Sequence, residues 1–272
     1  MSGVGTASPP DRPARPTIEQ IREVCQPEAI RGRHNSEHWV GDLYHRPLSP
    51  YLTRIFLRIG LSANAVTGVM IVTGWLAALA LLIPGLPGGL LAAFLGQLQM
   101  FIDCTDGEIA RWNRSQSPVG VFLDKVGHYT TEAAIAIALG LRAAGTFDIN
   151  SNWVFAGLLL AVVLLINKSL NDFVHVARAY AGLPKVEDSA AVTAPKAGLI
   201  ARLRRIARIV PFYKMFHSIE MTLLAFAASI IDVFTGDLIA TRILVGVMLP
   251  LAVLATIGHF IAILSSRRLK AA

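Results

Sequence analysis

Ionisable residues interrupt an otherwise apolar part of the chain between Asp103 and Glu132. Asp103 and Asp106 are three residues apart, and this spacing puts them on one face of a helix. Ionisable groups in a membrane segment are costly and normally line a cavity, pair with one another or hold an ion. A second polar series with four-residue spacing follows, so the two series predict a polar site where two neighbouring helices face each other: Gly120, Asp124, His128 and Glu132.

Three carboxylates beside one imidazole form a hard, oxygen-rich donor set, which suits Mg²⁺ or Mn²⁺ better than zinc. A magnesium site of this kind usually keeps coordination positions for phosphate oxygens. Gly107 and Ala110 would leave room for a ligand close to the backbone. Arg111 would supply a permanent positive charge for phosphate. The simpler interpretation is that the acids pair with nearby basic residues and fix helix ends, but the whole set at this spacing favours a metal site.

The composition indicates an integral membrane protein. Of the 272 residues, 54% are hydrophobic and only 16% are charged, which is outside the usual balance of a soluble domain. Apolar runs of about 20 residues can cross a bilayer as helices. The sequence therefore predicts an all-α membrane protein with six transmembrane helices and an N-terminal interfacial amphipathic helix. The six candidate spans are 65–83, 88–107, 121–144, 153–172, 214–235 and 240–264.

Two regions are expected along the chain. Residues 1–47 are predicted to be a cytosolic N-terminal segment, partly disordered because its Pro and small residues cannot bury enough surface. Residues 48–272 would form the membrane domain, including a juxtamembrane helix over 49–60. That helix is expected to lie in the membrane interface, because its apolar and basic positions fall on different faces. The apolar positions are Tyr51, Leu52, Ile55, Phe56 and Ile59, and the basic ones are Arg54 and Arg58.

The positive charges predict the orientation in the cytoplasmic membrane. All but two of the 25 Lys and Arg residues lie in segments on one side of the predicted spans, and Arg142 and Arg242 are the exceptions. Under the positive-inside rule, both termini and the acidic site of this multi-pass protein face the cytosol. The net charge of +7 then mainly reflects this topology, attraction to anionic lipid headgroups is a second consequence of it, and no nucleic-acid partner is expected. Cys25 and Cys104 fall on the cytosolic side, where a disulfide is not expected.

The acidic segment resembles the signature of the CDP-alcohol phosphotransferase (phosphatidyltransferase) family. It reads Asp103-x2-Asp106-Gly107-x2-Ala110-Arg111-x8-Gly120-x3-Asp124. The family signature ends with a further Asp four residues later, whereas this chain has His128 there. The six-span plan and the segment "LSANAVT" before the first span also resemble the family.

This resemblance implies a helical membrane enzyme, often a homodimer, that holds two divalent ions, Mg²⁺ or Mn²⁺. Asp103, Asp106 and Asp124 would be the metal ligands, and the donor nucleotide would bind near the small and basic motif positions. An acceptor hydroxyl would attack the phosphorus distal to cytidine, a phosphodiester would form, and CMP would leave. The donor expected first is CDP-diacylglycerol with a small polar acceptor, as in phospholipid biosynthesis; a CDP-linked polar alcohol with a lipid or sugar-alcohol acceptor comes second. The nucleotide-binding positions implied are Gly107, Ala110, Arg111 and Gly120.

His128 is predicted to act as the general base in place of the family's last Asp. Imidazole can accept a proton near neutral pH, closer to the working pH than an unperturbed carboxylate can. Glu132, one helical turn further along, would orient the ring. The alternative is that the lost carboxylate leaves a slow protein, or one of the same fold that binds without turnover.

A polar face continues the fourth predicted span and is a candidate acceptor site. Cationic and amide groups at helical spacing suit the phosphate or hydroxyls of a polar acceptor, although they could instead reach towards the interface as amphipathic side chains do. The candidates are Lys168, Asn171, His175 and Arg178, with Arg202, Arg204 and Arg205 as weaker ones.

Two other classes of membrane protein could also place acids in the bilayer. A transporter would tend to show interrupted helices or paired half-repeats, and the sequence shows neither. An intramembrane prenyltransferase would need a second Asp-rich segment, but "NKSLND" offers only Asp172.

Overall fold

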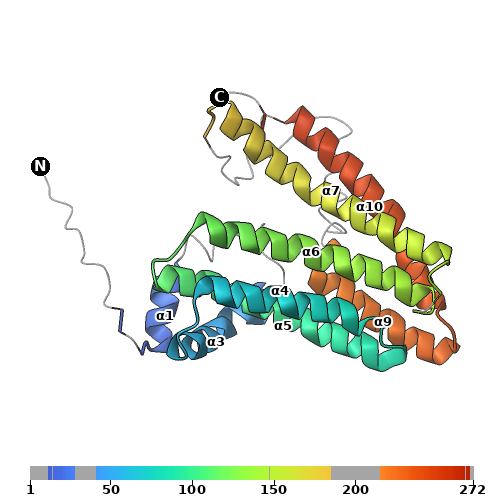
Figure 1. Cartoon of the computed structure of the whole chain (residues 1–272), viewed down its shortest axis with the longest axis horizontal. Coiled ribbons are helices and arrows are strands. Elements are labelled where there is room, and N and C mark those ends of the chain that lie inside the picture. The colour runs from blue at the N-terminus through green and yellow to red at the C-terminus, as the bar shows by residue number, and fades with distance from the viewer. Residues whose placement is uncertain are drawn as a thin grey trace, which may run out of the picture. The chain divides into compact units, whose positions relative to one another are not determined.

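Helices make up all the regular structure in the part of the chain that the computed structural model describes, which is residues 12–13, 15–27, 41–146, 148–184, 215–266 and 268–269. The predicted all-α class is therefore confirmed over these residues. The elements are α1 (Ile18–Cys25), the π-helix η1 (Gly41–His45), α3 (Arg46–Arg58), α4 (Ala63–Ala80), α5 (Gly85–Trp112), α6 (Pro118–Ala143), α7 (Asn152–Tyr180), α9 (Ser218–Thr235) and α10 (Ile239–Ser265) (Figure 1).

Five of the helices are long and apolar enough to cross a membrane, namely α4, α5, α7, α9 and α10. Each coincides with one of the predicted spans to within a few residues at most ends, because hydropathy is the dominant signal for such helices. The remaining predicted span corresponds to α6, which has 26 residues but carries several ionisable side chains. Its passage through the membrane stays a prediction. The basic segment 185–211 lies outside the described residues, as does all of the chain before Arg12.

Helix α3 corresponds to the predicted juxtamembrane helix 49–60, but it begins and ends slightly earlier in the chain. Gly60 follows it with φ +73°, and the Leu61 amide donates to the carbonyl of Phe56 at 3.0 Å, an arrangement typical of helix C-termini. The helix buries Ser49 and Thr53, so a polar stripe faces the protein. An exposed apolar face suits a membrane interface, but this location stays a prediction. The exposed apolar side chains are Leu48, Tyr51, Ile55 and Ile59.

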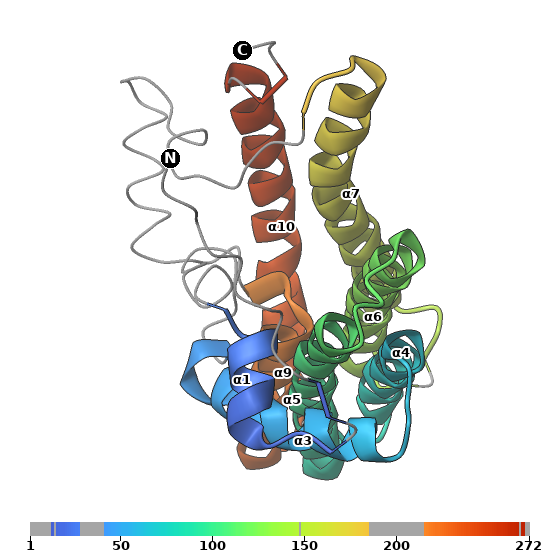
Figure 2. The same ribbon diagram turned by 90° about the vertical axis from the view of Figure 1, so that its left-hand side faces the viewer.

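The described residues pack as two units, and the first comprises those within Met1–Thr73 and Gln97–Gly127. In this unit α1 packs against α3 (Figure 2). A small apolar cluster joins the first part of α4 to the last part of α5, with side chains of α3 packed around it. Its buried members are Ala63, Val66, Met70, Ile71, Ile102 and Ile109.

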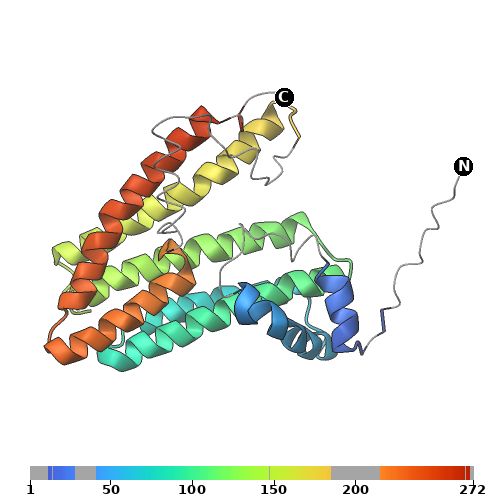
Figure 3. The same ribbon diagram turned by 180° about the vertical axis from the view of Figure 1, so that it is seen from behind.

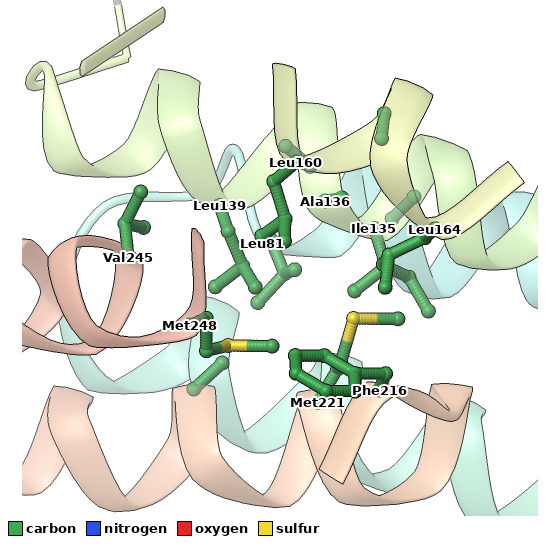
Figure 4. Packing of buried hydrophobic residues seen from close by; sticks show 14 of the residues in the cluster. Leu81, Ile135, Ala136, Leu139, Leu160, Leu164, Phe216, Met221, Val245 and Met248 are labelled. Carbon is green, nitrogen blue, oxygen red and sulfur yellow. The ribbon is translucent and has the colours of Figure 1, made fainter. Parts of the chain in front are cut away.

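The second unit comprises the described residues within Gly74–Gly96 and His128–Ala272. Within it α10 packs along both α7 and α9 (Figure 3). The core of this unit is built mainly from aliphatic, methionine and alanine side chains of α4, α5, α6, α7, α9 and α10, together with Leu81 of the α4–α5 turn and Phe216. Figure 4 shows the labelled members of this cluster: Leu81, Ile135, Ala136, Leu139, Leu160, Leu164, Phe216, Met221, Val245 and Met248.

Small residues allow the helices of the second unit to approach closely. A Cβ atom built on Gly140 of α6 would lie 2.7 Å from the Cα atom of Gly157 on α7. The same is true between α5 and α9, where a Cβ atom on Gly89 would lie 2.2 Å from the Ser229 hydroxyl. Membrane helices rely on such close packing because lipid provides no hydrophobic drive for their association.

Arg142 fixes the turn between α4 and α5. Its side chain is only 2% exposed and donates to the carbonyls of Leu81 (3.1 Å), Ile83 (2.9 Å) and Gly85 (2.6 Å). It also donates to the hydroxyl of Ser229 on α9 at 2.9 Å. A buried guanidinium needs hydrogen-bond acceptors; these bonds use both terminal nitrogens, while the buried Nε has no partner among the described residues. Arg142 therefore has a structural role. The distribution of Lys and Arg residues, from which the orientation was predicted, did not indicate this role.

The Gly140–Gly157 contact gives a test of the packing. We expect Gly140→Leu to lower the melting temperature in detergent by about 5 °C or more, because overpacking forces backbone shifts. The measurement is thermal unfolding followed by size-exclusion chromatography. Gly258→Leu is the matched control, since a Cβ atom on Gly258 of α10 would meet no atom of the described residues within 4 Å. Equal melting temperatures for the two variants would contradict the close crossing.

Candidate active site

Two of the predicted metal ligands meet in the structure. Carboxylate oxygens of Asp103 on α5 and Asp124 on α6 lie within 4.8 Å of each other. Helix α6 continues without a break, so His128 follows Asp124 by one turn and offers a ring nitrogen within the same distance of the Asp124 oxygen. All three side chains are half-buried. Two carboxylates and an imidazole are suitable donors for a divalent cation such as Mg²⁺ or Mn²⁺.

Asp106, the third predicted metal ligand, is held differently. Its Oδ2 accepts a hydrogen bond of 2.6 Å from the Thr67 hydroxyl of α4. The same hydroxyl lies 3.1 Å from the Ala63 carbonyl oxygen. Thr67 thus orients a motif carboxylate, and sequence reasoning missed it. The only signal available was its place in the segment "LSANAVT", where its side chain could not be assigned a partner.

The motif glycines and Arg111 also lie in the first unit. A Cβ atom on Gly107 would come 3.1 Å from Nη1 of Arg111, so the guanidinium lies over this glycine. Gly120 is close to the start of α4, since a Cβ atom there would lie 3.4 Å from Asn64 Oδ1. Ala110 packs against the apolar cluster of this unit. Gly107 and Arg111 therefore lie in contact with each other, while Ala110 also packs against the apolar core of the unit.

Glu108 lies within the motif and was not predicted to matter. Its side chain is 0% exposed, and Oε1 accepts from Gln26 Nε2 (2.8 Å) and the Ser49 hydroxyl (2.5 Å). Oε2 accepts from the Thr53 hydroxyl at 2.6 Å. The donors come from the segment after α1 and from α3. Such partners, far away in the chain, leave no spacing pattern by which to recognise them.

Glu132 makes an ion pair in the second unit. One oxygen lies 2.6 Å from Lys168 Nζ on α7 and 3.3 Å from Nδ1 of His217 at the start of α9. Beside this pair, the Tyr129 hydroxyl donates to Asp172 at 2.7 Å, and Lys168 Nζ lies 5.7 Å from the Tyr129 ring centroid. The orientation of His128 by Glu132 stays a prediction, and these contacts show that Glu132 also joins three helices.

The four predicted acceptor-binding residues have varied surroundings. Besides the Lys168 ion pair, Asn171 Oδ1 accepts from Arg268 at 3.2 Å. Arg178 donates to the carbonyls of Pro184 (2.9 Å) and Arg268 (2.8 Å). Among the described residues, no group hydrogen bonds with the buried Nδ1 of His175. Their role in binding an acceptor stays a prediction, and Arg202, Arg204 and Arg205 lie outside the described residues.

Comparison with known proteins identifies the family of the chain. The sequence profile of CDP-alcohol phosphatidyltransferases matches residues 61–264, a range that contains all the motif acids and the helices α4 to α10. No curated protein shows a significant match to the chain. Because the profile covers about three quarters of the sequence, the chain belongs to the CDP-alcohol phosphatidyltransferase family.

Proposed function

We propose that this protein transfers a phosphoalcohol group, with CDP-diacylglycerol as the first expected donor, to an acceptor hydroxyl and releases CMP. The family is a transferase family that uses CDP-alcohol donors and alcohol acceptors and is generally dependent on divalent metal. The observation that carries the proposal is the convergence of Asp103 and Asp124, with His128 one turn beyond. Five apolar helices and the family membership indicate an integral membrane protein.

The donor set fits hard divalent ions. Asp103 and Asp124 would supply oxygen ligands, and Asp106, oriented by Thr67, would supply a further one. We propose two ions of Mg²⁺ or Mn²⁺, as the family resemblance implies. When bound, such ions neutralise a diphosphate and stabilise the charge of the leaving phosphate. In addition to the ions, the guanidinium of Arg111, which lies beside Gly107, would bind the donor diphosphate.

His128 is the proposed general base. It would take the proton from the acceptor hydroxyl as the hydroxyl oxygen forms a bond to the phosphorus distal to cytidine. The bond from that phosphorus to the bridging oxygen breaks, and the electron pair leaves with CMP. The products are a phosphodiester, CMP and the proton on the imidazole. General-base catalysis of this kind contributes about 10²–10⁴-fold to a rate.

The second candidate is a relative with the same fold that binds a cytidine nucleotide without turnover. His128 favours it, because the family pattern has a carboxylate at that position. The two functions differ in one observable, the release of CMP.

We further propose a cytosolic site and cytosolic termini, from the distribution of basic residues, and a homodimer, from the family resemblance.

CMP release tests the proposed function directly. With Mg²⁺ or Mn²⁺, CDP-diacylglycerol and a pool of inositol phosphate, glycerol phosphate and serine, we expect the purified protein to release CMP. Asp106→Asn should lower the rate about 100-fold or more, since it removes one motif carboxylate. Asp148→Asn, a change at an exposed acid, is the control and should leave the rate unchanged. If wild-type protein binds cytidine nucleotide but releases no CMP from any CDP-alcohol, the binding-only alternative holds.

Variants at position 128 test the general base. His128→Ala should reduce kcat about 100-fold while the metal requirement remains. His128→Asp, which restores the family signature, should regain most of the turnover, because a carboxylate can fill the same role. The measurement is the steady-state rate of CMP release at saturating donor. Unchanged turnover in His128→Ala would rule out this residue as the base.

The polar face of α7 predicts a phosphorylated acceptor. His175→Ala and Lys168→Met should raise the KM for a phosphorylated acceptor about tenfold, as loss of a charge-assisted hydrogen bond does. The KM for an uncharged acceptor should change little. Assays of each pooled acceptor alone provide the comparison. A protein that reacts only with uncharged acceptors would contradict this assignment.

A further inference from the structure

The N-terminal helix α1 lies outside the family-matched range, which begins at residue 61, yet it packs on the motif-bearing end of α5. Ile21 and Cys25 of α1 are both 0% exposed and form one apolar cluster with Trp112, the last residue of α5. Val24 and Leu57 pack against this cluster. The helix has a complete capping box at Thr17 and Gln20, which stabilises its first turn. A defined helix is therefore docked against the end of α5 that carries the first half of the motif.

Hydrogen bonds from the N-terminal segment converge on Arg111. The Cys25 carbonyl oxygen accepts from Arg111 Nε at 2.7 Å. Arg12 Nη1 donates to the carbonyls of Arg111 (3.0 Å) and Trp112 (2.6 Å). The Cys25 thiol donates to the backbone carbonyl of Glu108 at 3.2 Å. Both the side chain and the backbone of Arg111 are thus held by residues that precede the matched range.

The buried carboxylate of Glu108 on α5 also holds the N-terminal helices against α5. Gln26, the residue directly after α1, reaches both Glu108 Oε1 at 2.8 Å and the carbonyl of Arg46 at 2.7 Å. Ser49 and Thr53 of α3 complete the acceptor set of the carboxylate. Two N-terminal helices are therefore tied to α5 through one side chain, and that side chain lies three residues before Arg111.

We propose that α1 and Glu108 position Arg111 for the diphosphate of a CDP-linked donor, with Glu108 as a positioning residue. This inference rests on the proposed function. An arginine has many rotamers, and fixing its Nε removes much of that freedom before the ligand arrives. The anchored guanidinium lies over Gly107, where only hydrogen stands in place of a side chain. The N-terminal segment would therefore strengthen donor binding without touching the donor.

Undocking α1 tests the proposal. Ile21→Asp places a charge in the buried cluster and should release the helix, whereas Glu23→Ala, at an exposed position of the same helix, should not. Burial raises the pKa of the Cys25 thiol to about 12, so in wild-type protein at pH 8 this thiol should react slowly with iodoacetamide. Ile21→Asp should speed its alkylation about tenfold or more, as read from the Cys25 peptide by mass spectrometry. An unchanged alkylation rate would contradict the docking itself.

Binding of CDP with Mg²⁺, measured by isothermal titration on the full-length protein, provides the functional readout. Ile21→Asp and Glu108→Gln should each weaken CDP binding about tenfold. In an Arg111→Lys background, neither should weaken it further, because the side chain being positioned is gone. Equal losses in both backgrounds would overturn the proposal and indicate a merely structural role. Wild-type protein that binds no CDP would instead overturn the proposed function, so the two failures are distinguishable.

Discussion

The need to compensate ionised groups in a region poor in water constrains this structure more than any other interaction. An isolated charge in a low-dielectric environment is strongly disfavoured, so buried charges are paired or hydrogen-bonded. The structure meets this need in three ways. Glu108 is satisfied by neutral donors, Glu132 by the ion pair with Lys168, and Arg142 mainly by backbone carbonyls. In each case compensation also joins segments that are distant in the sequence.

The need for charge compensation also applies to Asp103 and Asp124, where a bound cation is the proposed partner. Each is a half-buried carboxylate, and their oxygens lie within 4.8 Å. Two carboxylates at this separation repel each other when both carry a charge. A divalent cation would convert that repulsion into attraction, and a diphosphate would in turn balance the excess positive charge. The proposed metal and donor would therefore balance the charge of the site, which is a reason for two acids to lie close together there.

Hydropathy and residue spacing predicted the helices and the principal acids, because both signals are local. The apolar runs that correspond to α7 and α10 are examples, as is the facing of Asp103 by Asp124. Thr67 and Glu108 escaped prediction for the opposite reason. Thr67 contacts an acid 39 positions away, and the donors to Glu108 lie between 55 and 82 positions away. No local pattern encodes such contacts, so only the folded chain reveals them.

The family signature and the N-terminal segment contribute different parts of the candidate site. The signature fixes which side chains are present between Asp103 and Asp124, and hence which chemistry is available. It does not determine how rigidly Arg111 is held, since the contacts to its Nε and carbonyl come from Cys25 and Arg12, before the matched range. Catalysis and tight binding depend on groups being fixed before the ligand arrives. Two relatives with the same signature could thus differ in donor affinity through their N-terminal segments alone.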